Sequence, residues 1–107
     1  MADARIQVAA QIKRGEPFEV KVIIRHAMET GFRLTDDGKP IARNVIRVVT
    51  CRYNNAEVFR AETSSGLSAN PYLSFFVIAG DSGELLLEWV DDTGVTGRER
   101  AAVTVTG

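Results

Sequence analysis

The sequence of 107 residues lacks the features that mark several classes of protein. It has one cysteine, Cys51, so an internal disulfide is impossible and a disulfide-stabilised scaffold is excluded. No apolar run approaches the roughly 20 residues that a transmembrane helix needs, so we expect no membrane partner. The net charge of −1 and the pI near 5.8 argue against nucleic acid as a partner, because general nucleic-acid binders are normally basic.

Histidine is equally scarce. The only one, His26, lies 25 positions before Cys51. A zinc site needs four N, S or O ligands at characteristic spacings, and carboxylates would have to supply the rest. The iron-dependent sandwich proteins that reduce superoxide need several histidines and a cysteine, which this chain does not have. We therefore expect no metal and no other cofactor.

The chain also lacks the common catalytic motifs. It has no Gly-rich phosphate loop, no G-x-S-x-G elbow and no H-E-x-x-H. The carboxylate pairs Asp36-Asp37 and Asp91-Asp92 both stand in front of a glycine, where turn formation explains them. We therefore expect that the protein is not an enzyme.

The remaining candidates for covalent chemistry are Cys51 and His26. Cys51 shares the apolar face of its strand with Val49 and Tyr53, which favours a small buried hydrophobe over a reactive thiol. His26 continues the apolar face of the preceding strand, a position typical of a hydrogen-bonded residue at a strand end. A small thiol redox protein using Cys51 with His26 is the alternative that these residues leave open.

What the chain does contain is a repeated succession of strands and turns. Clusters of Gly, Asp and Asn separate short apolar or alternating runs, and no stretch has a helical period over three turns. The alternation is clearest where Phe18, Val20, Val22 and Ile24 point one way and charged residues the other. This pattern predicts seven strands, at about 4–10, 17–26, 44–53, 56–63, 70–79, 83–91 and 95–106.

Seven short strands in about 100 residues predict an all-β fold, an immunoglobulin-like antiparallel β-sandwich forming one domain over residues 1–107. The Cys…Trp…Cys pattern of antibody domains is missing, so the likeness is architectural. Tight hairpins are expected at YNNAE and DDTG. The run NPYLSFFVIA is apolar on both faces, which predicts a strand that is central or covered on both sides.

The longest irregular segment, about 27–43, begins within the sequence HAMETGFR, residues 26–33. Connections of this length tend to be functional or mobile, and Met, Arg and an aromatic residue are types that interfaces favour. The residues alone leave two interpretations open. Met28 and Phe32 either form a docking surface or tuck under the sandwich as parts of an ordinary loop.

Charge is distributed unevenly along the chain. Residues 1–60 carry 11 basic and 7 acidic residues, whereas residues 61–107 carry 2 and 7. Folding can average out this asymmetry, because sequence position is not surface position. A second hypothesis is a basic rim that steers anions or acidic partner surfaces. It would consist of Arg25, Arg33, Arg43 and Arg47.

Five segments, taken together, resemble the SoxZ family of sulfur-oxidation proteins in order and spacing. They are HAMETGFR, GKPIARNVI, CRYNNAEVFRAE, ANPYLSFFV and EWVDDTGV, and the resemblance runs from about Ile6 to Val105. The family usually has Pro where this chain has Ala27, and Tyr where it has Phe32. A role for a phenol at position 32 is therefore not expected here.

The resemblance implies an immunoglobulin-like sandwich that forms a heterodimer with SoxY. SoxY carries the sulfur adduct on a cysteine in its C-terminal arm, and SoxZ is the companion subunit that holds no substrate and meets other Sox enzymes transiently. The N-terminus shows no signal peptide, which by itself points to the cytoplasm. The resemblance instead implies the periplasm, reached by export with a partner that has a twin-arginine signal.

The partner-binding surface is predicted from residue types and from the strength of the shared segments. It combines the HAMETGFR loop with the start of the strand near residue 70. The predicted residues are His26, Met28, Glu29, Thr30, Gly31, Phe32, Arg33, Asn70, Pro71 and Tyr72. A free-standing immunoglobulin-like adhesion module, which would be indifferent to SoxY, is the remaining alternative.

Overall fold

The structure is a computed structural model that describes residues 4–26, 28, 32–62 and 71–107. These residues form nine strands and no helix. The strands are β1 (Ala4–Gln7), β2 (Ile12–Lys13), β3 (Pro17–Ile24), β4 (Ile46–Tyr53), β5 (Ala56–Glu62), β6 (Tyr72–Ile78), β7 (Gly83–Asp91), β8 (Thr96–Val103) and β9 (Val105–Thr106).

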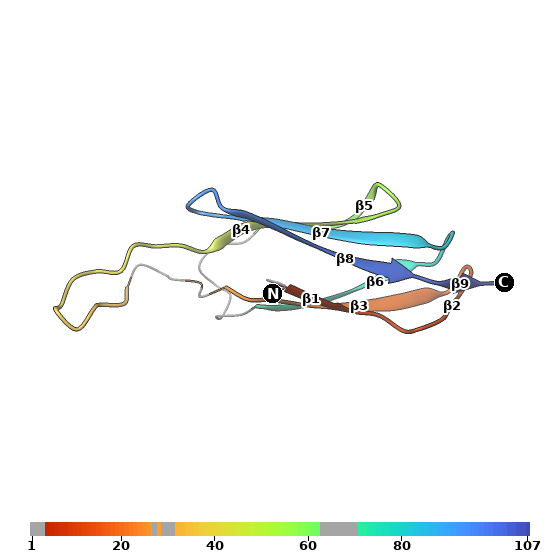
Figure 1. Cartoon of the computed structure of the whole chain (residues 1–107), viewed down its shortest axis with the longest axis horizontal. Coiled ribbons are helices and arrows are strands. Elements are labelled where there is room, and N and C mark those ends of the chain that lie inside the picture. The colour runs from red at the N-terminus through yellow and green to blue at the C-terminus, as the bar shows by residue number, and fades with distance from the viewer. Residues whose placement is uncertain (1–3, 27, 29–31, 63–70) are drawn as a thin grey trace.

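Two antiparallel sheets face each other as the layers of a sandwich (Figure 1). One sheet has the order β1-β3-β6 and the other has the order β5-β4-β7-β8. Along one side β1 packs next to β8, and a short parallel pair, β2 with β9, joins the layers at one end. The prediction of an all-β, immunoglobulin-like antiparallel sandwich is confirmed.

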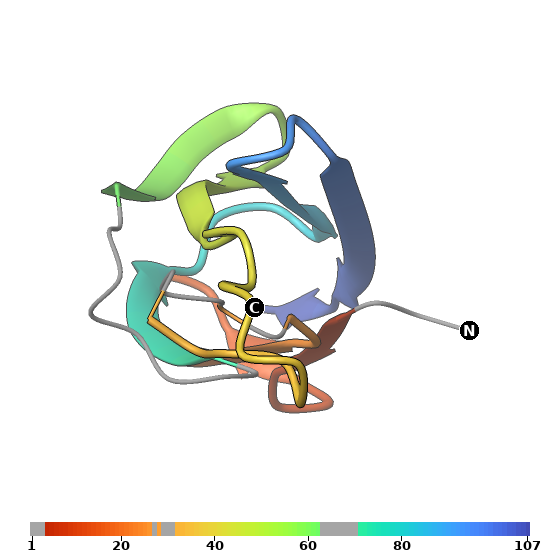
Figure 2. The same cartoon turned by 90° about the vertical axis from the view of Figure 1, so that its left-hand side faces the viewer.

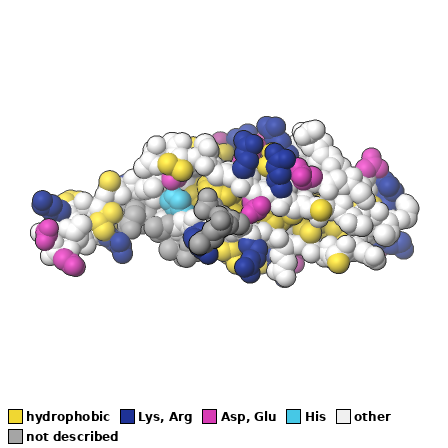
Figure 3. Space-filling view, in the orientation of Figure 1, with side chains coloured by type: hydrophobic (Ala, Val, Ile, Leu, Met, Phe, Trp, Pro, Cys, Tyr) yellow, Lys and Arg dark blue, Asp and Glu magenta, His cyan; other side chains and the backbone are white. Residues whose placement is uncertain are grey.

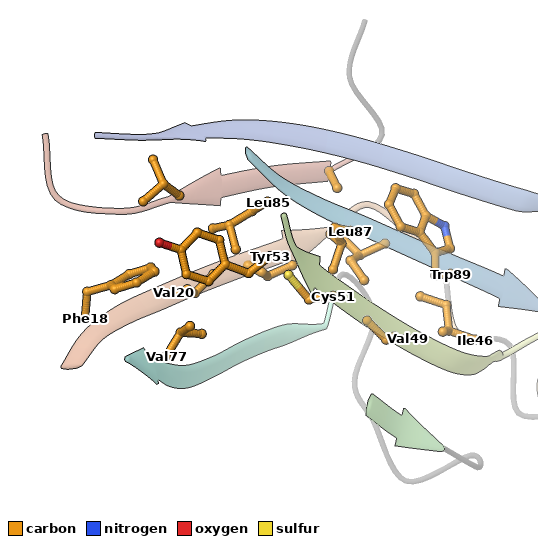
Figure 4. Packing of buried hydrophobic residues seen from close by; sticks show 14 of the residues in the cluster. Phe18, Val20, Ile46, Val49, Cys51, Tyr53, Val77, Leu85, Leu87 and Trp89 are labelled. Carbon is orange, nitrogen blue, oxygen red and sulfur yellow. The ribbon is translucent and has the colours of Figure 1, made fainter. Parts of the chain in front are cut away.

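The core lies between the sheets because alternate side chains of each strand point inward (Figure 4). The largest side chains with less than 2% exposure are Val20, Val22, Ile24, Val45, Ile46, Val49, Cys51, Leu85 and Leu87. Burial of each such apolar side chain contributes about 1.5–3 kcal/mol. The core therefore supplies most of the stabilisation of a domain that has no disulfide.

Two aromatic residues of the core, Tyr53 and Trp89, make specific contacts with their surroundings. The Tyr53 ring meets Phe18 edge to face at 5.9 Å, while its hydroxyl donates to the carbonyl of Asp81 and accepts from Gly80 N at 3.0 Å. Trp89 lies against Gly97 on the neighbouring strand, where a Cβ would come within 2.2 Å of the indole ring. Only glycine leaves room for that ring.

Both predicted hairpins are confirmed. Asn54 and Asn55 connect β4 to β5 with φ values of 49° and 73°, the positive angles that a two-residue type I′ turn requires. The DDTG segment connects β7 to β8, with Gly94 at a φ of 83°. Asparagine and glycine tolerate these angles better than other residues, which is why the turns could be predicted from sequence.

The expectation that residues 70–79 form a strand central or covered on both sides is wrong. In the described part of the chain β6 pairs with β3 alone and is therefore an edge strand of its sheet. Its outward residues Tyr72, Phe76 and Ile78 are 54%, 68% and 62% exposed. A run that is apolar on both faces can also arise where the outer face is available to a partner, and composition does not separate the two cases.

The strand count differs from seven for two local reasons. The short strand β2 was not predicted, and the expected final strand at 95–106 is divided into β8 and β9 at Thr104. The other boundaries agree or shift by at most three residues, as with β1, which ends at Gln7, and β3, which ends at Ile24. Such shifts are usual at strand ends.

The connection between β3 and β4 contains a projecting hairpin over residues 33–41, which we call the arm. Leu34 faces Pro40 across an antiparallel bridge, and Ile41 N donates to Arg33 O at 2.9 Å. The tip is a turn in which Gly38, at a φ of 79°, donates to Thr35 O. The arm leaves the sandwich at the end opposite β2 and β9 (Figures 1 and 2), in a molecule that measures 60 × 23 × 20 Å.

Candidate functional site

The inward faces of β3 and β7 both end in a polar residue at the arm end of the sandwich. His26 follows the apolar series that ends at Ile24, and Asp91 follows Leu87 and Trp89 in the same phase. The two meet across the layers, with His26 Nε2 3.1 Å from Asp91 Oδ2, and their side chains are 12% and 7% exposed. The prediction that His26 is a hydrogen-bonded residue at a strand end is confirmed.

A backbone contact assigns the tautomer of His26. Met28 N donates to Nδ1 at 3.0 Å, so Nδ1 carries no proton and Nε2–H donates to the Asp91 carboxylate. Met28 has a left-handed φ of 54° and is 5% exposed. Its Sδ accepts a hydrogen bond from Ile46 N at 3.3 Å. His26 therefore links Met28 to Asp91 at this end of the core, and both of its ring nitrogens are engaged in hydrogen bonds.

Asp91 is held as a carboxylate. Burial by itself raises the pKa of its carboxyl, but hydrogen bonds from Thr93, His26 and Val95 outweigh burial and lower the pKa to about 2. The Oδ1 atom accepts from Thr93 Oγ1 at 2.7 Å, from Thr93 N at 3.0 Å and from Val95 N at 3.1 Å. One carboxylate thus organises the β7–β8 turn and anchors His26 at the same time.

Asp92 links the same end of the sandwich to the chain that returns from the arm. Its Oδ2 accepts from Val45 N at 3.1 Å, and its carboxylate pairs with Arg43 Nε at 3.3 Å and Arg47 Nη1 at 3.0 Å. These contacts, the Val45 bond foremost, lower the pKa of Asp92. Arg43 and Arg47 of the hypothetical basic rim are therefore paired with an acid, while a steering role for the four arginines remains a prediction.

The cysteine is unsuited to chemistry at the surface. Cys51 is 0% exposed in the middle of β4, and burial raises the pKa of its thiol to about 11 (Figure 4). The thiol is therefore protonated near neutral pH, and the thiolate is the nucleophilic form. The expectation of a buried hydrophobe at Cys51 is confirmed, and this burial argues against the redox alternative.

The structure brings the two parts of the predicted partner-binding surface to one end of the sandwich. Ile24 N donates to Pro71 O at 3.0 Å, and Tyr72 lies opposite Ile23 in the register of β6 with β3. The start of β6 therefore lies beside the strand end that leads to His26. The predicted residues Glu29, Thr30, Gly31 and Asn70 lie outside the described residues.

The burial expected of an ordinary loop residue is found for Met28 but not for Phe32, and docking at Phe32 remains a prediction. Met28 is buried under the sandwich, whereas Phe32 at the base of the arm is 87% exposed and its neighbour Arg33 is also exposed. Leu34 on the arm is 63% exposed. In Figure 3 the arm at the left carries acidic, basic and apolar side chains, and the cyan histidine marks the end of the sandwich from which it projects. The arm end therefore presents charged and apolar side chains to solvent.

Sequence reasoning assigned Asp91 and Asp92 to turn formation alone and missed their structural role. Asp91 does form the turn, but it also bonds to His26, and Asp92 anchors Val45. A signal was present, because Asp91 continues the two-residue period of Leu85, Leu87 and Trp89 and therefore had to point inward. An inward carboxylate requires a partner, and the single histidine in the same phase of another strand was the available one.

Within residues 4–26, 28, 32–62 and 71–107, no three His, Cys, Asp or Glu side chains cluster closely enough to hold a metal ion. These residues also contain no helix that is long and apolar enough to cross a membrane.

A family model described as "Sulphur oxidation protein SoxZ" matches residues 6–102. The chain belongs to the SoxZ family. Membership confirms the resemblance found in the sequence and assigns the protein to the Sox sulfur-oxidation system. No curated protein matches the chain by sequence.

Solved structures share the fold of this SoxZ family member at low sequence identity. Superoxide reductase (neelaredoxin) from Ignicoccus hospitalis is 19% identical with a TM-score of 0.73, over 96% of this chain and 80% of that one. The sulfur carrier protein SoxY from Chlorobium limicola f thiosulfatophilum is 12% identical with a TM-score of 0.68, over 100% and 82%. A putative superoxide reductase from Thermotoga maritima is 15% identical with a TM-score of 0.71, over 97% and 86%. At these identities the likeness establishes the fold alone.

Proposed function

We propose that this protein is the non-catalytic subunit of a two-subunit sulfur carrier in thiosulfate oxidation. It binds and stabilises a SoxY-type subunit, whose C-terminal cysteine arm holds the covalent sulfur adduct. The observation that carries the proposal is the SoxZ family match over residues 6–102. The shared sandwich fold of SoxY supports it, because two such domains can pack through their sheets.

The chemistry of the chain supports placing the reactive sulfur on the partner. A carrier cysteine must reach several enzymes, so its thiol has to be exposed and easily ionised. Cys51 is 0% exposed with a pKa near 11, and His26 is held by Asp91 and Met28. Neither residue meets the requirement, so binding is the role that the described side chains support.

The proposed contact surface is the arm end of the sandwich. Phe32 exposes 87% of its surface and Tyr72 exposes 54%. Large apolar side chains that are exposed together are characteristic of docking surfaces, where aromatic residues often dominate the binding energy. Other Sox enzymes would meet the complex transiently.

We place the complex in the periplasm, reached by export of this chain together with its SoxY-type partner. The support is family membership, because the resemblance to SoxZ proteins implies export together with a partner that carries a twin-arginine signal.

Co-purification with a SoxY-type subunit tests the proposal. We expect a 1:1 complex. We expect the isolated chain neither to consume thiosulfate nor to form a covalent sulfur adduct on Cys51, which mass spectrometry would detect. Replacing Phe32 by Asp should weaken the complex by about tenfold or more, whereas Phe32→Tyr, which restores the usual family residue, should not. Failure to form a complex, or conversion of thiosulfate by this chain alone, would refute the proposal.

A further inference from the structure

The outer face of the three-stranded sheet carries an apolar stripe along β3 and β6. Ile23 and Tyr72 lie directly opposite each other, with exposures of 46% and 54%. Phe76 and Ile78 occupy outward positions further along β6, with exposures of 68% and 62%. We call these four residues the β6 stripe. Since successive outward residues of a strand share one face, all four are presented to the same side.

The outer face of the four-stranded sheet has the opposite character. Charged side chains line it and form ion pairs, with Arg98 3.4 Å from Glu88, Arg100 3.5 Å from Glu84 and Arg60 2.9 Å from Glu57. Such a face is well solvated and is costly to bury. The sandwich therefore has one face suited to water and one suited to a protein partner.

The polar residues beside the β6 stripe, Ser74, Glu19 and Lys21, can be covered as a group whose charges are paired. Ser74 Oγ lies between Tyr72 and Phe76 and donates to Glu19 Oε2 at 2.6 Å. The other oxygen of Glu19 is 3.7 Å from Lys21 Nζ. Burial of a polar group is costly chiefly when its hydrogen bonds are left unmade, and these groups already satisfy one another in part.

The size of the β6 stripe fits the centre of an interface. From the usual area of aromatic and aliphatic side chains, the four residues expose on the order of 400 Å². This is comparable with the largest apolar patches of monomers, which are often functional. A stable interface takes about 800 Å² from each partner, with an apolar centre and a polar rim. The β6 stripe would supply the centre, and the neighbouring charged residues would supply the rim.

We propose that the SoxY-type subunit docks on the outer face of the β1-β3-β6 sheet, with the β6 stripe at the centre of the contact. This inference rests on the proposed function and extends it to a sheet face that the HAMETGFR segment did not predict. Tyr72 lies at the arm end of β6, so one partner can cover the stripe and reach Phe32. SoxY has a sandwich fold, and the sheet face of such a domain can pack against this one.

A pair of matched substitutions tests the location. Phe76→Asp places a charge in the β6 stripe at a side chain that is 68% exposed. Ala102→Asp places the same charge on the outer face of the four-stranded sheet, at an exposed position of β8 opposite Glu84 and away from the arm end. We expect Phe76→Asp to raise the Kd for the SoxY-type subunit by about tenfold or more, and Ala102→Asp to leave it within about twofold. Thermal unfolding of each isolated variant verifies that it is folded, and Ile78→Lys replaces Phe76→Asp if that variant is not.

The outcomes separate this inference from the proposed function. If the unmodified chain does not bind a SoxY-type subunit, both fail. If it binds, but both variants bind equally well, the function stands and the sheet-face location is wrong. Sedimentation of the isolated chain tests whether a second copy of this chain, rather than a SoxY-type subunit, covers the β6 stripe. A stable homodimer that Phe76→Asp disperses would show that a second copy covers the face, and this too would overturn the inference.

Discussion

At the scale of single residues, the arm end of the sandwich depends on two polar side chains in otherwise apolar series. His26 and Asp91 each follow a run of inward hydrophobic residues, and they bond to each other at 3.1 Å. The position of His26 at a strand end was predictable from the period of its strand. The contact with Asp91 was not predicted, because turn formation already explained an acidic residue at that position, although the two-residue period of β7 places its side chain inward.

The depressed pKa of Asp91 makes stability depend on pH in a defined window. The pKa of Asp91 is about 2 in the folded chain, against about 3.9 in an unfolded one. The carboxylate therefore contributes its full stabilisation at pH values above the pKa of the unfolded chain. That contribution is lost as pH falls from about 5 through 2. We expect Asp91→Asn to lower the free energy of unfolding by about 2 kcal/mol at pH 7, and the difference from the unmodified chain to shrink towards pH 2.

Urea unfolding at a series of pH values measures this difference. Asp36→Asn is the control, because Asp36 lies in the exposed turn of the arm and its substitution should change stability by no more than about 0.5 kcal/mol at any pH. A deficit for Asp91→Asn that stays constant from pH 7 to pH 2 would contradict the assignment.

At the scale of elements, β6 and the arm show where sequence patterns lose their power. The alternation that identified β3 works because its outward residues are mostly polar, so polarity reports direction. In β6 the outward Tyr72, Phe76 and Ile78 are as apolar as the inward residues, and the pattern no longer separates core from surface. The existence of the strand was predictable, but its place at the end of a sheet was not.

The arm should be dispensable for folding. Residues 32–40 are all exposed, and the arm is closed mainly by its own backbone bonds. Replacing residues 34–40 by a short Gly-Ser link should therefore change the free energy of unfolding by no more than about 1 kcal/mol. Met28→Ala, at a core position that is 5% exposed, should cost about 2–5 kcal/mol.

Chemical unfolding of both variants supplies the comparison. A loss on arm removal as large as that of Met28→Ala would mean that the arm is part of the cooperative core. A two-stranded hairpin has little stability alone, so retention of the fold would point to contacts outside this chain as the reason for the arm.

At the scale of the whole molecule, the seven turn-separated runs predicted the architecture, and the sequence could specify little more. Counting strands gives a sandwich, because this number of half-buried strands needs two layers to cover its apolar faces. The parallel contact of β2 with β9 joins residues about 90 positions apart and involves two residues on each side. A contact so short and so distant leaves no periodic signal.

The single cysteine and the single tryptophan should report the same global transition. Cys51 is 0% exposed and Trp89 is 7% exposed, both between the sheets. In a domain that unfolds in one step, we expect no reaction of the native thiol with Ellman's reagent near neutral pH. The urea midpoints of labelling and of tryptophan fluorescence should then coincide. Rapid labelling of the native chain would instead revive the thiol redox alternative.

The pairing of β2 with β9 at one end of the sandwich also has a practical consequence. Arg14 Nε donates to the carbonyl of Gly107 at 3.0 Å, which fixes the last residue to the end of the sandwich farthest from the arm. A tether attached there would display the arm and the full length of both sheets to solution. Immobilising the protein through this residue therefore gives an oriented surface on which partner proteins can reach the arm and the outer faces of both sheets.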